Sequence, residues 1–467
     1  MKIGDLIATD LQIDVSGISY DSRNTMPGDV FVAIQGFAAD GHDFALAARE
    51  KGAVCVVCER ELAGLDVPCI IVPDSRAALA VMSHRFFGHP SREFKLIGVT
   101  GTNGKTTVTC LIKQILEQKG KKVGLIGTNQ NMIGEQVLPA SHTTPESYEL
   151  ARLFREMADS GCEYVVAEVS SHALALRRVD GCEFYAAAFT NLTRDHLDFH
   201  KTMENYLNAK SILFQMCNYG IINIDDPAGR TIADTAGCEV ITYGIGGGDV
   251  TAEHIVTSAE GVEFDCAGRH IWLGIPGKFS VYNCLAAIGV ATALGVSGAD
   301  FAHALLNAKG VKGRVELIPT RRDFSVIIDY AHTPDGLRNI LETVREFTKG
   351  RLVVVFGCGG DRDKTKRPMM GKIAGELADY CVITSDNPRS EEPAAVIRDI
   401  LAGMNAATAE YIVVENRRDA IEYAITRAAA DDVIVLAGKG HETYQVLAGK
   451  TIHFDEREIV AEILEHI

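Results

Sequence analysis

The feature that most constrains this chain is a glycine loop between an apolar run and a helical pattern. Residues 94–99 form an apolar run typical of a buried strand, and Thr100–Gly104, with two glycines in five residues, indicates a turn. Apolar side chains at helical spacing follow from Val108, which predicts a helix beginning near Lys105. In this order, backbone N–H groups and the positive end of a helix dipole converge on one point. The segment therefore predicts a phosphate cradle.

The expected ATP-binding residues of this cradle are consecutive in the chain: Gly101, Thr102, Asn103, Gly104, Lys105, Thr106 and Thr107. We expect Lys105 to reach the outer phosphates and Thr106 to offer its hydroxyl to Mg²⁺. The spacing departs from the standard pattern, because Val99 stands where that pattern has glycine and Gly98 comes one place earlier. A Gly-Lys-Thr turn that starts a helix by chance is the alternative, and the flanking strand and helix favour ATP binding over it.

Composition narrows the class of protein. At 467 residues the chain is too long for one core, which predicts about two to four domains. The net charge of −16 argues against nucleic acid or an acidic membrane as a partner. No apolar run is long enough to cross a membrane and no export signal follows Met1, so we expect a cytoplasmic protein. The 12 cysteines, Cys55 and Cys58 included, lie mostly in apolar patterns, and we expect them to be reduced and buried.

The strand and helix patterns predict an α/β protein of three domains. Residues 1–86 form a small α/β domain, residues 87–314 a central parallel sheet of the P-loop ATPase kind, and residues 315–467 a Rossmann-like, doubly wound sheet. The central sheet is expected to have an antiparallel edge, which we assign to the short alternating strands of residues 250–275. Tyr20–Arg23 is a polar segment, and on its own it predicts an ordinary turn.

Charged residues follow several of the predicted strands. Glu168 closes an apolar strand near the phosphate loop, where it is either a Mg²⁺ ligand or a solvated strand-end carboxylate. In the last domain, taken singly, Arg362 could be a solvated side chain, Asp386 a helix cap and Arg389 a member of a surface ion pair. The loops that carry them should nevertheless meet on one rim of one sheet. Arg362 also stands where a dinucleotide fingerprint needs glycine, which disfavours hydride chemistry.

The combination of motifs resembles the Mur ligase family of bacterial peptidoglycan synthesis over the whole chain. The motifs are residues 100–107, Glu168–His172, Asn191–His196, Asp329–Asp335 and Gly438–Glu442. Residues 386–389, Asp-Asn-Pro-Arg, are similar to the segment with which some members recognise meso-diaminopimelate. The resemblance implies an ADP-forming amide ligase that uses ATP and Mg²⁺ to join meso-2,6-diaminopimelate to the D-glutamate carboxylate of UDP-N-acetylmuramoyl-L-alanyl-D-glutamate through an acyl phosphate. Such an enzyme serves cell-wall synthesis, cell shape and cell division.

The same resemblance implies roles for residues around the nucleotide. Lys210 would be carbamylated and help to hold a second Mg²⁺, with Thr106 and Glu168 as the other metal ligands and His196 nearby. On the sequence alone Lys210 reads as a helix-surface lysine. Arg314 would face the γ-phosphate after domain closure. Two further residues would contact the nucleotide: Asn283 and Asp329.

Two substrate sites are implied in the same way. The residues expected to bind the UDP-sugar peptide are Ser22, Thr143, Thr144, Ser170 and Arg178. The family often has Gln two places before that Arg, and Leu176 stands there in this chain. The residues expected to bind diaminopimelate are Arg362, Asp386, Asn387, Pro388, Arg389, Gly438 and Glu442.

Charge is expected to decide which amino acid is added. Diaminopimelate has a carboxylate that lysine lacks, and an Arg fork such as that of Arg389 binds a carboxylate with two hydrogen bonds. The alternatives that stay open are the same ligase adding L-lysine or another amino acid, an amide ligase resembling folylpolyglutamate synthase, and, in a different class, a nucleotide-switch NTPase. We expect a monomer without a nucleic-acid partner.

Overall fold

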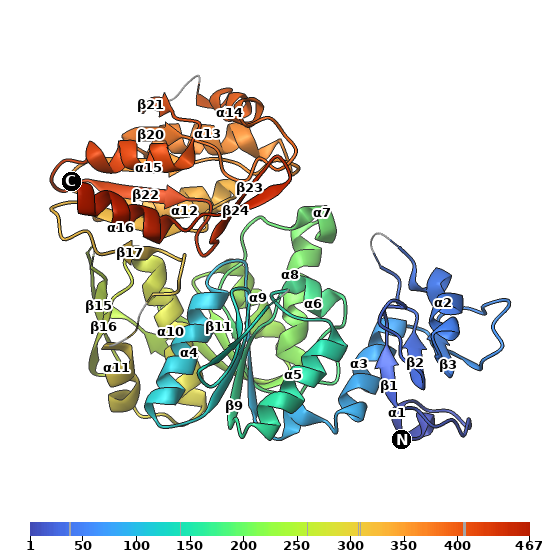
Figure 1. Ribbon diagram of the computed structural model, residues 1–467. Coiled ribbons are helices and arrows are strands. Elements are labelled where there is room, and N and C mark those ends of the chain that lie inside the picture. Colours follow the sequence, from blue (N-terminus) through green and yellow to red (C-terminus); the bar gives the residue numbers. More distant parts are fainter. Residues whose placement is uncertain (37–38, 141, 259, 307, 309, 405–407) are drawn as a thin grey trace. The chain divides into compact units, whose positions relative to one another are not determined.

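The chain divides into two compact units, which are described separately below. The computed structural model describes residues 1–36, 39–140, 142–258, 260–306, 308, 310–404 and 408–467. The first unit comprises residues 1–249 with 286–296, and the second comprises residues 250–285 with 297–467. The division falls within helix α10 (Lys278–Ala293) (Figure 1).

The N-terminal part of the first unit is built on a small parallel sheet with the order β1-β2-β3-β4 (Figure 1). Its strands are rich in Val, Ile and Cys, and β2 and β3 are buried along their whole length, as expected for strands covered on both faces. The elements are β1 (Gly17–Ser19), β2 (Asp29–Val32), β3 (Cys55–Cys58), β4 (Cys69–Ile71), α1 (Ile3–Leu6), the 3₁₀ helix η1 (Gly41–Phe44), α2 (Ala45–Glu50) and α3 (Ser75–Phe86).

The central sheet has the order β12-β11-β10-β5-β9-β6-β7-β8 within the first unit. Six of these strands run parallel, and β7 and β8 add an antiparallel edge beside β6. The strands are β5 (Lys95–Thr100), β6 (Val123–Ile126), β7 (Asn131–Ile133), β8 (Gln136–Leu138), β9 (Tyr164–Glu168), β10 (Phe184–Phe189), β11 (Cys217–Asn223) and β12 (Glu239–Gly244). An antiparallel edge is therefore present. The antiparallel hairpins that we predicted in residues 250–275 are present as well, but the strands within residues 253–273 form a separate sheet instead of that edge.

Helices connect the parallel strands of this sheet (Figure 1). In such sheets the turns at the carboxyl ends of the strands form the ligand-binding edge. α4 follows β5 directly after the glycine loop, and α6 follows β9 after two residues. The helices are η2 (Pro90–Arg92), α4 (Lys105–Gln118), α5 (Ser147–Asp159), α6 (Ser171–Ala175), α7 (Leu197–His200), α8 (Met203–Ser211), η3 (Ile212–Gln215) and α9 (Pro227–Thr235).

The second unit contains a six-stranded sheet with the order β17-β18-β22-β19-β20-β21. Five strands are parallel, as expected for a doubly wound sheet, and the edge strand β17 pairs antiparallel with β18. Along β19 the side chains of Val354 and Phe356 enter the core on one face, and those of Val353 and Val355 enter the core on the other. Both faces are therefore covered by helices (Figure 1).

The second unit also contains two small antiparallel sheets, β14-β15-β16 and β23-β24. The sequence did not predict that β14, β15 and β16 form a sheet of their own, because period-two alternation indicates hairpins but not the sheet that they join. The strands are β13 (Val250–Thr251), β14 (Glu253–Thr257), β15 (Val262–Cys266), β16 (Arg269–Leu273), β17 (Glu316–Ile318), β18 (Ser325–Asp329), β19 (Leu352–Phe356), β20 (Tyr380–Ile383), β21 (Glu410–Val413), β22 (Val433–Ala437), β23 (Tyr444–Leu447) and β24 (Lys450–His453). The helices are α11 (Gly298–Leu306), α12 (Pro334–Arg345), α13 (Lys366–Leu377), α14 (Pro393–Leu401), α15 (Arg417–Thr426) and α16 (Glu456–His466).

Within the described parts of the chain, every helix is too short or too polar to span a membrane. The 12 cysteines are all free thiols. Nine of them are buried, and Cys69, Cys110 and Cys238 are partly buried. The expectation of reduced cysteines packed inside the fold is confirmed.

Candidate functional site

The predicted glycine loop lies between β5 and α4, and both of its glycines have left-handed backbone. Gly101 has φ +148° and Gly104 has φ +86°, conformations that side-chain-bearing residues rarely adopt. Space is also limiting at Gly101, where an added Cβ would lie 1.8 Å from Oγ1 of Thr190. Val99, at the position where the standard pattern has glycine, is a fully buried residue of β5. The first glycine of the loop is therefore Gly101, two residues after that position, whereas Gly104, Lys105 and Thr106 keep the standard spacing.

The loop after β10 holds the glycine loop in place. The backbone N–H of Thr102 donates to the carbonyl of Asn191 at 2.8 Å, and that of Asn103 donates to the Asn191 side-chain oxygen at 2.9 Å. The Thr190 hydroxyl donates to the carbonyl of Asn103 at 2.6 Å. Within the loop, Nζ of Lys105 donates to the carbonyls of Gly101 and Thr102, both at 2.9 Å. The ammonium group is thereby held over the loop, where phosphates would bind.

A hydroxyl and a carboxylate meet beside this loop. Glu168, the last residue of β9, is 1% exposed, and its Oε1 accepts from the Thr106 hydroxyl at 3.0 Å and from the backbone N–H of Thr128 at 2.9 Å. Its Oε2 accepts from the Thr128 hydroxyl at 3.0 Å. Of the two meanings considered for Glu168, the solvated strand-end carboxylate is wrong. Thr128 is a partner that no sequence motif pointed to.

This pair of oxygen donors fits Mg²⁺. Hydroxyl and carboxylate oxygens are the ligands that Mg²⁺ prefers, and it commonly takes one or two protein groups and completes its shell with water and substrate phosphates. Among the residues that the structure describes, no group of three or more His, Cys, Asp or Glu side chains forms a complete metal cage. The chemistry of Thr106 and Glu168 thus suits a metal that a nucleotide brings with it.

Lys210 lies at the end of α8 and is 1% exposed, so its reading as a helix-surface lysine is wrong. Its Nζ lies 4.5 Å from the ring centroid of Tyr206, whose hydroxyl is 3.2 Å from the Thr102 hydroxyl in the glycine loop. Burial, and then the nearby charge of Lys105, lowers the pKa of Lys210 well below its usual range. The amine is therefore poised to be uncharged and nucleophilic, which is the form that carbamylation requires.

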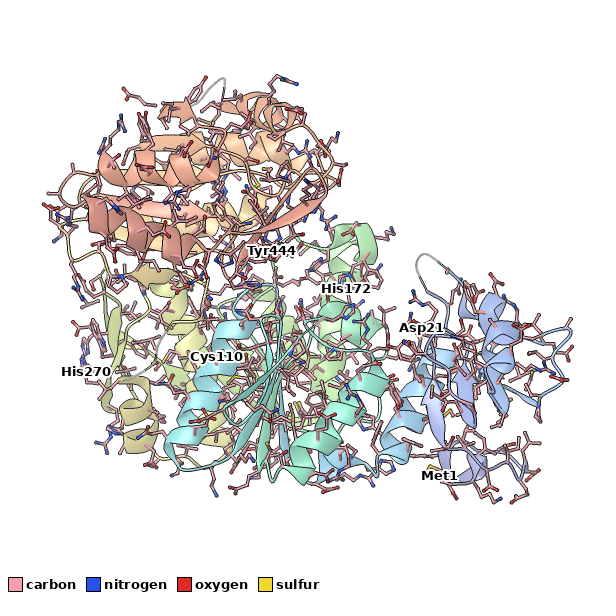
Figure 2. The ribbon with its side chains drawn as sticks, in the orientation of Figure 1. Met1, Asp21, Cys110, His172, His270 and Tyr444 are labelled. Carbon is pink, nitrogen blue, oxygen red and sulfur yellow. The ribbon has the colours of Figure 1, made fainter. Side chains whose placement is uncertain are left out.

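Three histidines gather next to Lys210. The ring of His172 lies 4.8 Å from that of His196 and 5.4 Å from that of His200, measured between centroids; His172 is labelled in Figure 2. His200 stacks on Tyr206 at 4.9 Å, and burial lowers its pKa to about 4. His196 has left-handed backbone, with φ +53°, at the start of α7. The predicted residues Lys210 and His196 therefore both lie beside Tyr206, which contacts the glycine loop.

Three of the residues predicted for the UDP-sugar peptide interlock at the carboxyl end of β9. The Thr144 hydroxyl donates to the Glu168 carbonyl at 2.8 Å and accepts from the backbone N–H of Ser170 at 3.1 Å. Nη1 of Arg178 donates to the Thr144 carbonyl at 3.1 Å. Thr143 joins them through the Thr128 hydroxyl, at 3.0 Å. The fifth predicted residue, Ser22, is buried in the loop after β1.

Glu146 is a residue of this region that the motifs did not identify. One oxygen, Oε2, lies 3.1 Å from Nη1 of Arg76 and 3.3 Å from Nε of Arg178. Arg76 belongs to α3 and also donates to the Gln35 carbonyl at 3.0 Å. A single carboxylate thus ties the N-terminal sheet region to the predicted peptide site. The contact of Glu146 with Arg76 could not be predicted from the sequence, because the two residues are far apart in the chain.

In the second unit, the polar loops after β18, β19, β20 and β22 lie on one rim of the six-stranded sheet, as expected for the carboxyl ends of parallel strands. Asp329 ends β18, and its Oδ2 accepts from the backbone N–H of Val315 at 2.8 Å; burial raises its pKa. The guanidinium of Arg314 lies 4.8 Å from the ring centroid of Tyr330. Asn283, predicted to contact the nucleotide, is buried on α10.

Arg362 and Arg389 approach each other at Gly359. A Cβ on Gly359 would lie 2.9 Å from Nη1 of Arg389 and 3.7 Å from Cγ of Arg362. Nη1 of Arg389 donates to the Gly360 carbonyl at 2.8 Å and to the Asn387 carbonyl at 3.4 Å, and Arg389 has left-handed backbone with φ +54°. Arg362 is exposed, in agreement with the solvated alternative. Within the described residues Arg389 forms no ion pair at contact distance, and its hydrogen bonds go to two carbonyls, so its reading as part of a surface ion pair is wrong.

Asp386 is 5% exposed and caps no helix, so that alternative is also wrong. Nδ2 of Asn387 donates to Oε2 of Glu442 at 2.9 Å. Pro388, the next residue in the chain before Arg389, is buried. Gly438 has φ +117°, and an added Cβ would lie 2.8 Å from Oδ2 of Asp386. The residues predicted for the amino acid thus form one connected group. Lys439, which sequence reasoning passed over, lies at its centre.

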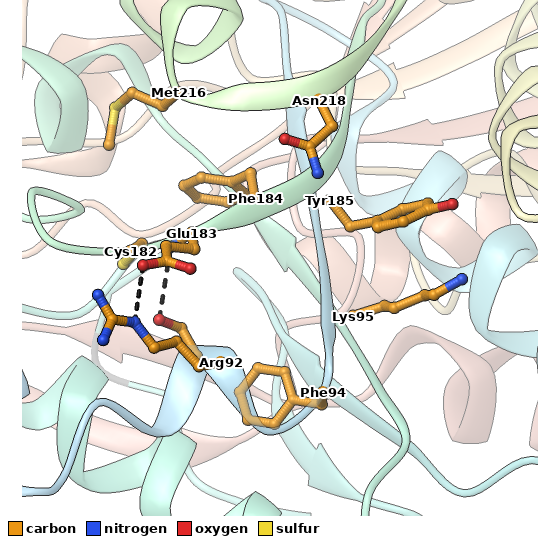
Figure 3. Close-up of a pocket in the computed structure, with 10 residues that line it drawn as sticks. Arg92, Phe94, Lys95, Cys182, Glu183, Phe184, Tyr185, Met216 and Asn218 are labelled. Atoms are coloured by element: carbon orange, nitrogen blue, oxygen red, sulfur yellow. Dashed lines mark hydrogen bonds and ion pairs between the residues drawn. The ribbon is translucent and has the colours of Figure 1, made fainter.

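A pocket of about 350 Å³ lies elsewhere in the first unit (Figure 3). Its lining includes Lys95, Phe184 and Tyr185 at the amino ends of β5 and β10, and the ion pair of Arg92 with Glu183 at 2.7 Å closes one side (Figure 3). Parallel α/β sheets bind ligands at the opposite, carboxyl ends of their strands. Strand polarity therefore separates this pocket from the glycine loop, and we assign the candidate site to the loop.

Comparisons with known protein families agree with this geometry. Three family models match: "Mur ligase family, catalytic domain" over residues 14–87, "Mur ligase middle domain" over residues 99–291, and "Mur ligase, glutamate ligase domain" over residues 313–440. A relative from Caldanaerobacter subterraneus, named UDP-N-acetylmuramoyl-L-alanyl-D-glutamate–2,6-diaminopimelate ligase, is 52% identical over 97% of this chain and 95% of its own.

Solved structures are similar over comparable lengths. A structure of a UDP-N-acetylmuramoyl-L-alanyl-D-glutamate–2,6-diaminopimelate ligase has a TM-score of 0.74 and 30% identity, and covers 100% of this chain and 99% of that one. Folylpolyglutamate synthase from Mycobacterium tuberculosis has a TM-score of 0.63 at 18% identity, over 78% of this chain and 92% of that one, which shows a common fold only. The family models and the relative at 52% identity establish that this chain belongs to the Mur ligase family.

Proposed function

We propose that this chain is the ATP-dependent ligase that adds meso-2,6-diaminopimelate to the D-glutamate side-chain carboxylate of UDP-N-acetylmuramoyl-L-alanyl-D-glutamate. A relative that carries this activity in its name is 52% identical over nearly the full length. We propose the domain boundaries 1–86, 87–314 and 315–467 for UDP-sugar, ATP and amino-acid binding. The chain would work as a monomer in the cytoplasm.

The observation that carries the choice of amino acid is the charge pattern around Asn387. Its carbonyl accepts from the guanidinium of Arg389, while its side-chain amide donates to the carboxylate of Glu442. A cation that lacks a carboxylate partner therefore lies next to a group of acidic side chains. Diaminopimelate carries two ammonium groups and two carboxylates, so it can satisfy both halves of this pattern, and lysine would leave the guanidinium unpaired.

The first chemical step would transfer the γ-phosphoryl group of ATP to the D-glutamate carboxylate, giving an acyl phosphate and ADP. Two anions must approach each other, so cations have to offset their repulsion. The ammonium of Lys105, held over the glycine loop by two carbonyls, is placed for this. Mg²⁺, held by Thr106 and Glu168, would neutralise phosphate charge when bound. The amine of diaminopimelate would then attack the acyl carbon, and phosphate would leave as the amide forms.

Lys210 is proposed to act as a carbamate. Its uncharged Nζ would form a bond to the carbon of CO₂ and lose a proton, which turns a buried cation into a buried anion. The lowered pKa of Lys210 supports this, because a protonated amine has no lone pair for the attack. His196 and the proposed metal ligand Glu168 would share the surroundings of that anion. Arg314, Asn283 and Asp329 remain our prediction for the remaining nucleotide contacts.

A product assay tests the proposal directly. The purified chain is given the UDP-dipeptide precursor, ATP and Mg²⁺, with diaminopimelate, L-lysine or no amino acid, and the UDP-tripeptide is detected by mass spectrometry. We expect product with diaminopimelate and at least about 100-fold less with lysine. Phosphate release without an amino acid at the full rate would support a nucleotide-switch NTPase instead. Product with a folate acceptor, and none with the UDP-dipeptide, would support the folylpolyglutamate synthase alternative.

A further inference from the structure

Lys439 is a buried cation in direct contact with the residues proposed to bind the amino acid. It is 0% exposed. Its Nζ donates to Oε2 of Glu442 at 3.1 Å and to Oδ1 of Asn387 at 3.2 Å, and lies 3.7 Å from Oδ1 of Asp386. One ammonium group therefore joins residues that come from the loops after two different strands, β20 and β22.

The backbone around Lys439 is shaped to turn its side chain inward. It stands between Gly438, with φ +117°, and Gly440, with φ +54°, directly after β22. At Gly438 a Cβ would lie 2.8 Å from Oδ2 of Asp386, and at Gly440 it would lie 2.6 Å from Cβ of Tyr330. Any other residue at either position would displace the loop. The two glycines thus allow the lysine to approach Asp386 and Glu442 closely.

The surroundings of Lys439 make its charge necessary. The rings of Tyr444 and Phe454 lie 5.7 Å and 5.8 Å from its Nζ; Tyr444 is labelled in Figure 2. Two other buried cations of this unit already have partners: Arg417 is paired with the fully buried Glu456 at 2.8 Å, and Arg367 with Glu391 at 2.8 Å. Carboxylates in such a poorly solvated place need a cation of their own. For Asp386 and Glu442 the described cation within ion-pair distance is Lys439.

The contacts also orient the acidic groups. Lys439 and Asn387 both donate to the same oxygen of Glu442, Oε2, which fixes the carboxylate plane and leaves Oε1 for another donor. Lys439 lies near Oδ1 of Asp386, while Oδ2 faces Gly438. Each carboxylate is thus held from the inside through one oxygen. The second oxygens can accept from the ammonium groups of an amino acid.

We propose that Lys439 is a positioning residue for the amino-acid substrate: it holds Asp386, Asn387 and Glu442 in the arrangement that accepts the substrate's ammonium groups. The proposal rests on the proposed function. In this proposal Lys439 does not contact the substrate, because its ammonium group is fully enclosed and donates to protein oxygens. Its effect should therefore be confined to the binding of the amino acid.

The test compares Lys439→Met with Lys372→Met, which removes an exposed lysine from α13 of the same unit. We expect Lys439→Met to raise KM for diaminopimelate by about 30-fold or more, with KM for ATP and for the UDP-dipeptide and kcat at saturating amino acid all within about threefold of the parent. A purely structural role would lower the active fraction and so reduce kcat with KM unchanged, and that result would overturn the proposal. So would equal behaviour of the two lysine variants.

A second pair of variants keeps the test informative if Lys439→Met fails to fold. Lys439→Met/Glu442→Gln removes the buried cation together with one of its partner charges, which is easier to accommodate than either charge alone. If Lys439 acts through Glu442, the double variant should have a diaminopimelate KM within about threefold of that of Glu442→Gln alone. If the increases in diaminopimelate KM caused by the two single substitutions multiplied in the double variant, the proposal would be contradicted. A parent chain that makes no product from diaminopimelate would refute the proposed function instead, before any variant is compared.

Discussion

The hydroxyl of Thr106 donates a hydrogen bond to Oε1 of Glu168 across 3.0 Å, which joins the first turn of α4 to the last residue of β9. The two residues are far apart in the chain and come together because β5 and β9 are parallel neighbours in the sheet. Two hard oxygen donors therefore lie side by side at the helix end that attracts phosphate. This pair is the part of the site on which the proposed chemistry depends first.

Glu168→Gln should weaken the use of Mg²⁺ without disturbing the fold. The amide retains an oxygen that can accept from Thr106 and Thr128, but it removes the negative charge that attracts a divalent cation. At about 1 mM Mg²⁺ we expect a rate of product formation about 100-fold below that of the parent. Half-maximal activity should need an about tenfold higher Mg²⁺ concentration. Glu135→Gln, an exposed carboxylate in the turn between β7 and β8, is the matched control. An unchanged Mg²⁺ requirement in Glu168→Gln would remove Glu168 from the metal site.

Lys210→Met should make the protein more stable and much less active. The folded state lowers the pKa of Lys210 below its usual value of 10.5, so near neutral pH the unfolded chain binds more protons at this residue than the folded chain does. The free energy of unfolding therefore rises with pH up to about pH 10.5, and methionine removes this penalty. We expect the gain in Tm over the parent to be largest near pH 7 and to shrink toward pH 10, measured in CO₂-free buffer.

The activity of Lys210→Met should fall by on the order of 10²–10³-fold if the carbamate serves the chemistry. The parent enzyme should lose activity on removal of CO₂ and regain it with bicarbonate, and a carbamate signal should appear in ¹³C NMR with labelled bicarbonate. Lys349→Met, at an exposed lysine, controls for the change of charge. Full activity of Lys210→Met would exclude the proposed carbamate.

Much of the nucleotide region follows from local pattern alone. The glycine loop with an apolar strand before it and a helical pattern after it is a local signal, and the structure has β5 and α4 where that signal put them. The rim of the second unit was predictable as well, because parallel strands bring their carboxyl ends to one edge. In both regions neighbouring residues, or a general rule about sheets, carry the information.

Burial and distant partners were not predictable in the same way. Lys210 looks like any polar residue on α8 until the ring of Tyr206 and the glycine loop cover it. Lys439 lies in a motif that was noticed, but its role as a buried cation depends on Asp386 and Glu442 from two loops. The hairpins of residues 253–273 were predicted, but not the separate sheet that they form, since alternation with period two is the same in strands of any sheet. These features arise from tertiary contacts rather than from local sequence.

His84→Leu should reduce the loss of stability in acid. His84 is fully buried on α3, its Nε2 lies 3.4 Å from Sγ of Cys182, and burial lowers its pKa from 6.5 to about 4. Between these values the unfolded chain binds the proton and the folded chain does not, so the free energy of unfolding falls as the pH falls from about 6.5 toward 4. The expected loss is about 3 kcal/mol at pH 4. Calorimetric unfolding from pH 4 to 8 measures it, with the exposed His303→Gln as control. A slope equal to that of the parent would contradict the assignment.

Arg389→Ala should change which amino acid is used more than how ATP binds. The guanidinium, anchored by the carbonyls of Gly360 and Asn387, is the proposed partner of the extra carboxylate of diaminopimelate. Its loss should lower kcat/KM for diaminopimelate by about 10³-fold, while KM for ATP changes less than about threefold. Alanine and arginine pay a similar free-energy cost for the left-handed backbone at this position. The substitution therefore does not change the local backbone strain.

The matched control is Arg398→Ala, which removes an exposed guanidinium from α14 of the same sheet region. Activity with L-lysine is the decisive comparison, because lysine has no second carboxylate and should be used about equally poorly by the parent and by Arg389→Ala. The ratio of the two amino acids should therefore move toward one in the variant. If the rates with diaminopimelate and lysine fell together, or if KM for ATP rose in step, Arg389 would act on the fold or the nucleotide rather than on the extra carboxylate.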